Sequence, residues 1–277
     1  MLSYQHSYHA GGPADVHKHL ALVLLLRHLT AKAKPAAVVD LYAGNGVYAL
    51  SAPEAQKTGE YQSGIAKLWD LPNPPPAFAA YLDVVKRLNP GILSLYPGSP
   101  EIAQRLLRDT DHIVLNELHP GAFTALKRWA GNDPRINTHK RDGLEALLAL
   151  VPPKVRRGLV LVDPSFEMKT DYTEIPARLA KAVDKWREGI FMVWYPVLGD
   201  ARHLPLLTGI AAIAAPSVIA EWSFAAAPDK GLKGTGIVVI NPPWKFDSEM
   251  ADTGKVLAKL LGGKHAMRWL RADDQAA

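Results

Sequence analysis

Short apolar runs rich in β-branched residues alternate with segments of helical periodicity along most of the chain. Such runs predict buried strands, because a parallel sheet is covered on both faces. We predict strands at 36–41, 113–117, 159–163, 190–195, 218–224 and 237–241, and a weaker one at 135–139. Helical patterns cover 15–29, 100–108, 122–130, 143–150 and 175–188. This alternation favours an α/β fold with a doubly wound, mostly parallel sheet.

Two stretches depart from the alternation. No long helix separates 218–224 from 237–241, so we interpret these strands as an antiparallel hairpin that closes the sheet edge. Between Leu50 and Tyr96 no convincing strand is found, and two helices are predicted at 59–69 and 77–88. The prolines between them cannot lie inside a helix. We therefore expect one domain over 1–277 with an inserted helical subdomain at 52–96.

A glycine-containing turn follows the first strand, in Val38-Val39-Asp40-Leu41-Tyr42-Ala43-Gly44-Asn45-Gly46. Glycine at the carboxyl end of a central strand lets the backbone approach a ligand closely. The third glycine of the dinucleotide fingerprint is missing, and the next acidic strand end, Glu117, follows only about 70 residues later. This spacing favours S-adenosylmethionine over NAD, with an ordinary tight turn as the alternative.

Three polar positions follow strands or begin helices. Glu117 could accept both ribose hydroxyls of an adenosyl group, or be a solvated acid. Asp142, before Gly143, could accept from the adenine amine of a cofactor, and with Glu145 it also forms a helix N-cap of the capping-box type. Ser99 similarly predicts an N-cap before a proline. Asp142 and Ser99 can each cap a helix and contact a cofactor at once.

The segment Asp163-Pro164-Ser165-Phe166 resembles the [Asp/Asn]-Pro-Pro-[aromatic] signature of amino-methyltransferases. The lone pair of adenine N6 is delocalised into the ring. An Asp163 oxygen and the Pro164 carbonyl could accept both N6 hydrogens and free that lone pair, while Phe166 stacks on a flipped base. Alignment with an already activated methyl donor supplies most of the rate. A strand end followed by a simple turn is the alternative.

A second segment, Asn241-Pro242-Pro243-Trp244, matches that signature better letter by letter. It follows the predicted hairpin, whereas the amine-binding motif belongs on the fourth strand, beside the glycine-loop strand. Asp163 comes soon after Asp142, as this order requires. We therefore favour Asp163, and Asn241 is either a further lining residue or a plain hairpin exit.

Composition narrows the chemistry. The chain has no cysteine, which excludes disulfides, thiolate zinc sites, iron–sulfur clusters and a cysteine nucleophile. Enzymes that methylate C5 of pyrimidines usually need that nucleophile, so a nucleic-acid target would be a heteroatom. The net charge of +5 suits a polyanionic partner, although charge alone leaves that partner open.

The amino-terminal residues carry several histidines and aromatics around Lys18. His17 and His19 lie on different helix faces and no carboxylate triad accompanies them, so we expect no metal site. Stacking and phosphate contact suit this segment better. It has no basic stretch followed by an apolar core, and the apolar run from Leu20 to Leu26 is too short to span a bilayer. We expect a cytoplasmic protein without a membrane partner.

Motifs along nearly the whole chain resemble the ribosomal large-subunit methyltransferase J family (RlmJ). They include Met1-Leu2-Ser3-Tyr4, Thr58-Gly59-Glu60-Tyr61, Tyr96-Pro97-Gly98-Ser99-Pro100, Glu117-Leu118-His119-Pro120, Glu167-Met168-Lys169-Thr170-Asp171-Tyr172, Trp194-Tyr195-Pro196 and Gly236 to Trp244. The resemblance implies N6 methylation of one adenine in 23S ribosomal RNA with S-adenosylmethionine, by a Rossmann-like enzyme with a helical insert. We expect a monomer.

The resemblance also implies roles for individual residues. The expected cofactor contacts are Lys18, His19, Tyr42, Gly44, Ser99, Glu117, Asp142, Gly143 and Asp163. The expected catalytic residues are Asp163, Pro164 and Phe166, and the expected RNA contacts are Tyr4, His6 and Lys18. The family often has histidine at the position of Tyr42, and it usually has Asp-Pro-Pro-Tyr where this chain has Asp-Pro-Ser-Phe.

Three other functions remain open from the residues alone. A non-catalytic RNA-binding protein on the same fold would explain Ser165. A DNA adenine methyltransferase would use the same acceptor chemistry. The Asn-Pro-Pro-Trp segment suggests a protein-glutamine methyltransferase, which would not need the basic charge.

Overall fold

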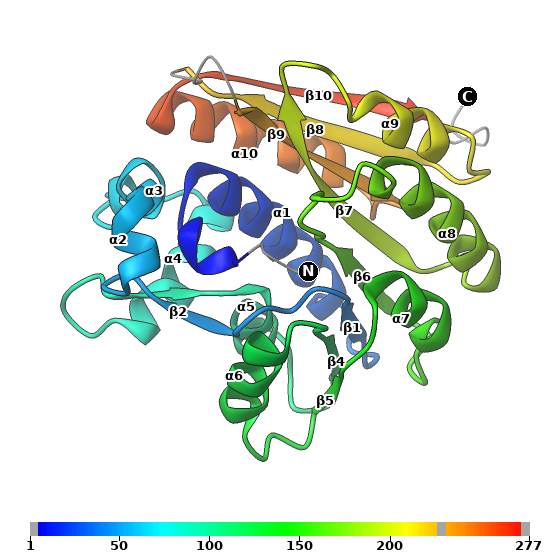
Figure 1. The fold of residues 1–277 in the computed structure, drawn as a ribbon, viewed down its shortest axis with the longest axis horizontal. Helices are drawn as coiled ribbons and strands as arrows, with labels where there is room; N and C mark the ends of the chain where they lie inside the picture. Colours follow the sequence, from blue (N-terminus) through cyan, green and yellow to red (C-terminus); the bar gives the residue numbers. More distant parts are fainter. Residues whose placement is uncertain (1–4, 226–230, 273–277) are drawn as a thin grey trace.

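The structure is a computed structural model that describes residues 5–225 and 231–272. Eight strands form its central sheet (Figure 1): β1 (Ala37–Asp40), β4 (His112–Asn116), β5 (Ile136–His139), β6 (Gly158–Val162), β7 (Ile190–Leu198), β8 (Ser217–Ser223), β9 (Leu232–Ile240) and β10 (Lys264–Arg271). Their order is β10-β8-β9-β7-β6-β1-β4-β5. The strands from β5 to β7 pair in parallel. The predicted Rossmann-like, doubly wound fold is confirmed.

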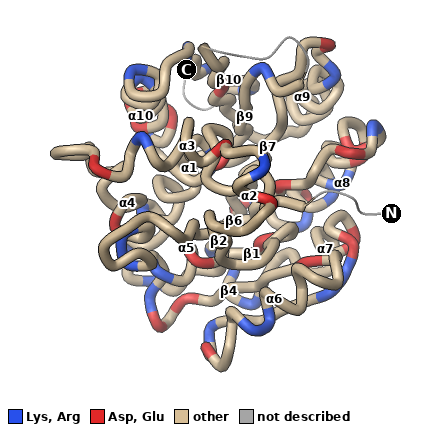
Figure 2. The backbone as a smooth tube through the Cα atoms, turned by 60° about the vertical axis from the view of Figure 1, so that its left-hand side comes forward, with Lys and Arg blue, Asp and Glu red and all other residues tan. Residues whose placement is uncertain are grey.

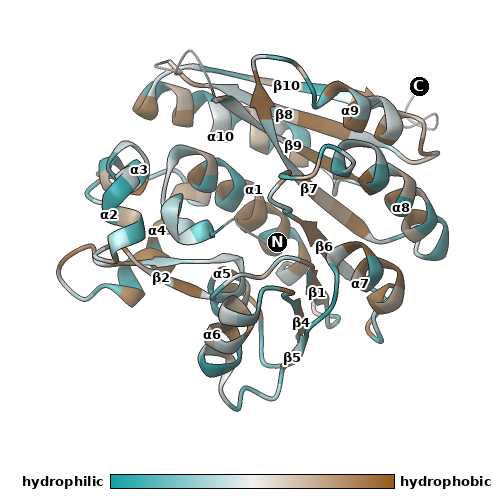
Figure 3. Ribbon diagram, in the orientation of Figure 1, coloured by the Kyte–Doolittle hydropathy of each residue, from teal (hydrophilic) through white to brown (hydrophobic). Residues whose placement is uncertain are grey.

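Helices cover both faces of this sheet (Figure 1). One face packs against α1 (Pro13–Thr30), α5 (Ser99–Leu106), α6 (Pro120–Ala130) and α10 (Phe246–Leu261), and the other against α7 (Gly143–Leu150), α8 (Asp171–Lys185) and α9 (Leu204–Ala211). Successive residues of β6 alternate between the two cores: Leu159 belongs to the first and Val160 to the second. The continuous apolar runs follow from this double coverage (Figure 3).

Helix α1 is buried on nearly every side. It packs against α4 (Pro76–Leu88), α5 and α10 as well as the sheet. A helix in such a position is apolar all round, which explains the run from Leu20 to Leu26. Its first turns carry buried polar residues instead, namely Asp15, His17, Lys18 and His19. No helix among the described residues is long and apolar enough to cross a membrane.

The segment between β1 and β4 is only partly as predicted. Two short antiparallel strands, β2 (Val47–Ala49) and β3 (Leu95–Pro97), pair outside the main sheet and were not predicted. Between them lie α2 (Pro53–Thr58), α3 (Glu60–Ser63), the 3₁₀ helix η2 (Ile65–Lys67) and α4. The continuous helix predicted at 59–69 is wrong, because the chain breaks at Gly64. The subdomain boundaries at 52–96 stay a prediction.

The carboxyl-terminal part contains the predicted hairpin and more. β8 and β9 pair antiparallel as expected, and β9 also pairs antiparallel with β7. The hairpin does not close the sheet, however, because β10 pairs with β8 and takes the edge. Since β9 runs against the parallel strands, it ends where they begin: Ile240 lies opposite Phe191 at the start of β7.

Candidate active site

A cavity of about 890 Å³ opens at the carboxyl ends of β1, β4 and β6. In open α/β sheets this edge, where the strand order reverses, is where ligands bind. The predicted site residues that line it are His6, Lys18, His19, Tyr42, Gly44, Ser99, Glu117, Asp142, Gly143, Asp163 and Pro164. The structure therefore gathers most of the predicted site. Tyr4 lies outside the described residues.

The glycine loop is tied to the next strand by Glu117. Gly44 has a left-handed backbone (φ 63°), and its N–H donates to Glu117 Oε2 at 2.8 Å. The other oxygen, Oε1, accepts from the His119 N–H at 2.7 Å. A Cβ on Gly44 would come within 2.1 Å of the Tyr48 hydroxyl, so only glycine fits. The carboxylate is held in place while each oxygen keeps a lone pair free.

Asp142 and Gly143 form a second wall of the cavity. Asp142 Oδ1 caps α7 by accepting from the N–H groups of Leu144 and Glu145, at 2.9 and 3.1 Å. The predicted N-cap is confirmed and leaves Oδ2 for another donor, but among the described residues Glu145 does not return the bond that a capping box would have. A Cβ on Gly143 would lie 2.3 Å from Tyr42 Cζ, so the Tyr42 ring packs directly on this backbone. Burial raises the pKa of Tyr42, which keeps its hydroxyl protonated.

Ser99 does not cap α5, because Gly98 occupies the N-cap position. Its hydroxyl instead donates to Asp40 Oδ2 at 2.6 Å, and the Tyr42 N–H donates to Asp40 Oδ1 at 3.1 Å. Burial raises the pKa of Asp40 to about 7 even though these two bonds oppose it. Asp40 was missed as a site residue, although an acid at the end of an apolar strand was a usable signal.

Lys18 joins two carboxylates beneath the cavity. Its Nζ lies 2.6 Å from Asp163 Oδ2 and 2.8 Å from Asp15 Oδ1. Asp15 Oδ2 in turn lies 2.9 Å from His6 Nε2. Burial disfavours the ammonium charge, but the two carboxylates raise the pKa of Lys18 well above its usual value. A polar chain thus connects the amino-terminal segment with the end of β6, through Asp15, which was also missed from the sequence.

His19 faces the cavity from the next position of α1. It is buried, and its Nδ1 lies 2.8 Å from the Tyr96 hydroxyl, which contacts the Tyr81 hydroxyl at 2.9 Å. Burial lowers the pKa of His19 to about 3. The imidazole is therefore neutral near pH 7.

Phe166 departs from its predicted role. Its backbone is left-handed (φ 53°), and its ring stacks on Tyr172 with centroids 4.8 Å apart and also contacts Trp194. The side chain is 7% exposed and does not line the cavity. Stacking of Phe166 on a substrate base is therefore not available in this conformation, because the turn directs the ring into the core.

Asn241, the alternative to Asp163 in the sequence, lies at the end of the sheet where the parallel strands begin. Its Nδ2 donates to the carbonyls of Arg187 and Gly189, at 2.7 and 2.8 Å. It does not line the cavity, because β9 is antiparallel. Within 5–225 and 231–272, no three His, Asp or Glu side chains form a group that could hold a metal ion.

Comparisons with known proteins agree with this geometry. The family model "Ribosomal RNA large subunit methyltransferase D, RlmJ" matches residues 33–271. "Ribosomal RNA large subunit methyltransferase J" of Escherichia coli (strain K12) is 41% identical over 254 residues, 90% of each chain. The Haemophilus influenzae protein of the same name is 38% identical over 274 residues, 97% of each chain.

A solved structure supports the same relationship. A crystal structure of a Legionella pneumophila protein superposes with a TM-score of 0.88 at 35% identity, covering 94% of this chain and 98% of that one. The cavity, the acidic strand ends and these matches lead to one conclusion: the chain belongs to the RlmJ family of ribosomal RNA large-subunit methyltransferases, enzymes whose methyl donor is S-adenosylmethionine.

Proposed function

We propose that this protein methylates the N6 amine of one adenine in 23S ribosomal RNA. The observation that carries the proposal is the position of Asp163: its carboxylate lies in the cavity at the end of β6, next to the glycine-loop strand β1, and Pro164 follows it. The names of the Escherichia coli and Haemophilus influenzae relatives supply the ribosomal RNA.

The acidic lining of the cavity matches the positive charges of S-adenosylmethionine. Among the described residues, two cations, Lys18 and Arg178, line it, against seven acids: Glu117, Asp142, Glu145, Asp163, Glu167, Asp171 and Glu174. Such a lining suits a ligand with a sulfonium and an ammonium group. Bound there, the cofactor supplies an electrophilic methyl group.

Individual groups fit its adenosyl half. The Glu117 carboxylate is placed to accept ribose hydroxyls, and Asp142 Oδ2 to accept from the adenine amine. Gly44 and Gly143 present bare backbone between them, since a side chain at either position would collide with a tyrosine. We propose that Tyr42, Ser99 and His19 complete this part of the site.

The residues that directly follow β6 act on the substrate amine. Asp163 Oδ1 and the Pro164 carbonyl accept the two N6 hydrogens, which directs the nitrogen lone pair toward the methyl donor. Formation of the N–C bond would break the S–C bond of the donor, whose sulfur keeps the electron pair, and the nitrogen would release one of these protons to solvent. Lys18 holds Asp163 through Oδ2, so the carboxylate keeps one orientation and its other oxygen stays free for the amine.

The amino-terminal segment borders the substrate side of the cavity. His6 and Lys18 line it and are joined through Asp15. We propose that His6, together with Tyr4, contacts the RNA strand that carries the target base. This contact would couple RNA binding to the carboxylate that performs the chemistry.

Single-turnover methylation of one target stem-loop, made as RNA and as DNA, tests this function. We expect N6-methyladenine in the RNA only, because the 2′-hydroxyl distinguishes the two. Equal transfer to both would identify a DNA-competent adenine methyltransferase. Binding of S-adenosylmethionine by calorimetry without any transfer would identify a non-catalytic RNA-binding protein.

A further inference from the structure

Basic residues gather at the end of the sheet opposite the cavity, where the parallel strands begin. Among the described residues, the exposed cations there include Lys32, Lys34, Lys154, Arg187 and Lys245. They stand in segments that precede the parallel strands β1, β6 and β7 or follow the antiparallel strand β9. None of these five pairs with a carboxylate among the described residues, whereas the neighbouring Arg156 pairs with Glu188. The cavity lining, in contrast, is dominated by acids.

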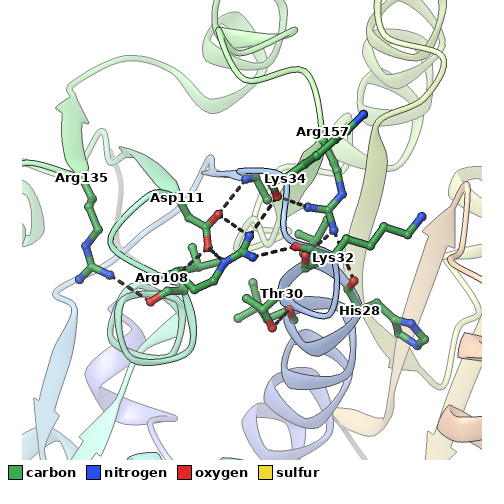
Figure 4. Close-up of polar contacts among 12 residues, drawn as sticks. His28, Thr30, Lys32, Lys34, Arg108, Asp111, Arg135 and Arg157 are labelled. Carbon is green, nitrogen blue, oxygen red and sulfur yellow. Dashed lines mark hydrogen bonds and ion pairs between the residues drawn. The ribbon is translucent and has the colours of Figure 1, made fainter.

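Hydrogen bonds join these segments into one surface. The Arg108 guanidinium bonds the carbonyls of Lys32 and Lys34, at 2.7 and 3.0 Å, and Arg157 bonds the Lys34 carbonyl at 2.8 Å (Figure 4). Trp186 Nε1 bonds the Arg156 carbonyl at 2.7 Å. Asn241 closes the set by bonding the Arg187 carbonyl.

These bonds use the carbonyl groups of Lys32, Lys34 and Arg187, and the charged ends of these three side chains pair with no carboxylate among the described residues. Figure 4 shows the Lys32 side chain extending away from the bonds that its carbonyl accepts. Basic positions also occur on several elements in Figure 2, rather than on one helix. The backbone that carries Lys32, Lys34 and Arg187 is thus held by hydrogen bonds while their charged groups are available to phosphates.

Trp244 adds an aromatic group to this edge. It is 84% exposed and stands between Pro243 and Lys245. An exposed tryptophan beside free cations is the combination on which nucleic acids stack. An acidic protein partner could pair with the cations, but only a nucleic acid also offers bases that stack on an exposed tryptophan.

We propose that Lys32, Lys34, Lys154, Arg187, Lys245 and Trp244, which we term the far-edge surface, bind a second segment of the RNA substrate. The proposal rests on RNA being the substrate. The far-edge surface and the cavity lie at opposite ends of the parallel strands, of which β6 has five residues and is about 17 Å long. Because the two surfaces face away from each other, a short stem-loop bound at the cavity points away from the far-edge surface, whereas a large folded RNA can bend around the sheet to it.

The test compares wild type with the triple variant Lys32→Gln/Lys34→Gln/Arg187→Gln, which keeps all the carbonyls that the frame uses. A matched control, Lys181→Gln/Lys255→Gln/Lys259→Gln, removes the same charge from exposed positions of α8 and α10. Binding to a large-subunit rRNA domain transcript and to the isolated target stem-loop is titrated against salt, with S-adenosylhomocysteine present.

We expect the triple variant to lose about tenfold in affinity for the transcript, and its plot of log affinity against log salt to become shallower by about 2. Trp244→Ala should lose about fivefold. Stem-loop binding and methylation, which report separately on the proposed function, should stay at the wild-type level. Unchanged transcript binding would overturn the proposal. So would an equal loss in the control, or wild-type binding to polyglutamate as tight as to RNA.

Discussion

Two segments of this chain carry nearly the same four-residue signature. They lie at opposite ends of the strands of one sheet. Asp163-Pro164-Ser165-Phe166 follows the parallel strand β6 and opens into the cavity, whereas Asn241-Pro242-Pro243-Trp244 follows the antiparallel strand β9 and faces away from it. The segment with the poorer match holds the candidate acceptor. Strand direction decides which copy can meet a ligand, because ligands bind at the carboxyl ends of the parallel strands.

The largest difference between the segments should be in catalysis. Asp163→Ala removes one of the two proposed acceptors for the N6 hydrogens, and we expect the single-turnover rate to fall about a thousandfold. Asn241→Ala, the matched control, should keep a rate within about threefold of wild type. A catalytic loss confined to the Asn241 variant would reverse the assignment of the two segments.

The ion pair that holds Asp163 can be removed without changing Asp163 itself. Lys18→Met leaves the buried Asp15 carboxylate and the partly buried Asp163 carboxylate without their cation, and we expect a loss of about 3 kcal/mol in unfolding free energy. The double variant Asp15→Asn/Lys18→Met should recover part of this loss in denaturant titrations. If the single variant is as stable as wild type, the charge chain does not hold this edge together.

Asp40, at the cavity end of β1, should make the unfolding free energy depend on pH. Its carboxyl has a pKa of about 7 in the folded chain against an ordinary 3.8, so the folded state binds the proton more tightly. As pH rises from about 4 to about 7, this group alone lowers stability, by on the order of 2–4 kcal/mol. Asp40→Asn should lack that decline when its unfolding free energy is followed across the range. Parallel stability curves for the two proteins would refute the assigned protonation.

The smallest expected effect is on the fold at Asn241. Its side chain bonds two carbonyls before β7, and Asn241→Ala should lower the unfolding free energy by about 1–2 kcal/mol. Urea titration measures the loss. A variant of unchanged stability but impaired methylation would show that this segment serves the reaction instead of the sheet.

Periodicity predicted most of the main sheet, because its central strands are buried on both faces and have continuous apolar runs. β10 escaped prediction because it is a charged edge strand whose formation depends on β8 far away in sequence. α10 begins at a left-handed Lys245 without a side-chain cap, so it has no start signal. β2 and β3 are too short for any periodicity.

At the site, the residue types were predictable and their partners were not. Strand-end acids such as Glu117 and Asp163 stood out, because an acid after an apolar run marks the carboxyl edge. That Lys18 would lie between Asp15 and Asp163 depends on α1 crossing the end of β6, a contact 145 residues apart along the chain. The burial of Phe166 depends on one positive φ angle, which the sequence does not specify.

The most direct test of the proposed function is a map of N6-methyladenine in ribosomal RNA from cells with and without the gene. We predict that one modified adenine of 23S ribosomal RNA is lost on deletion and returns with the wild-type gene, but not with Asp163→Ala. A map unchanged by deletion, or a lost methyl group at a position other than adenine N6, would contradict the account.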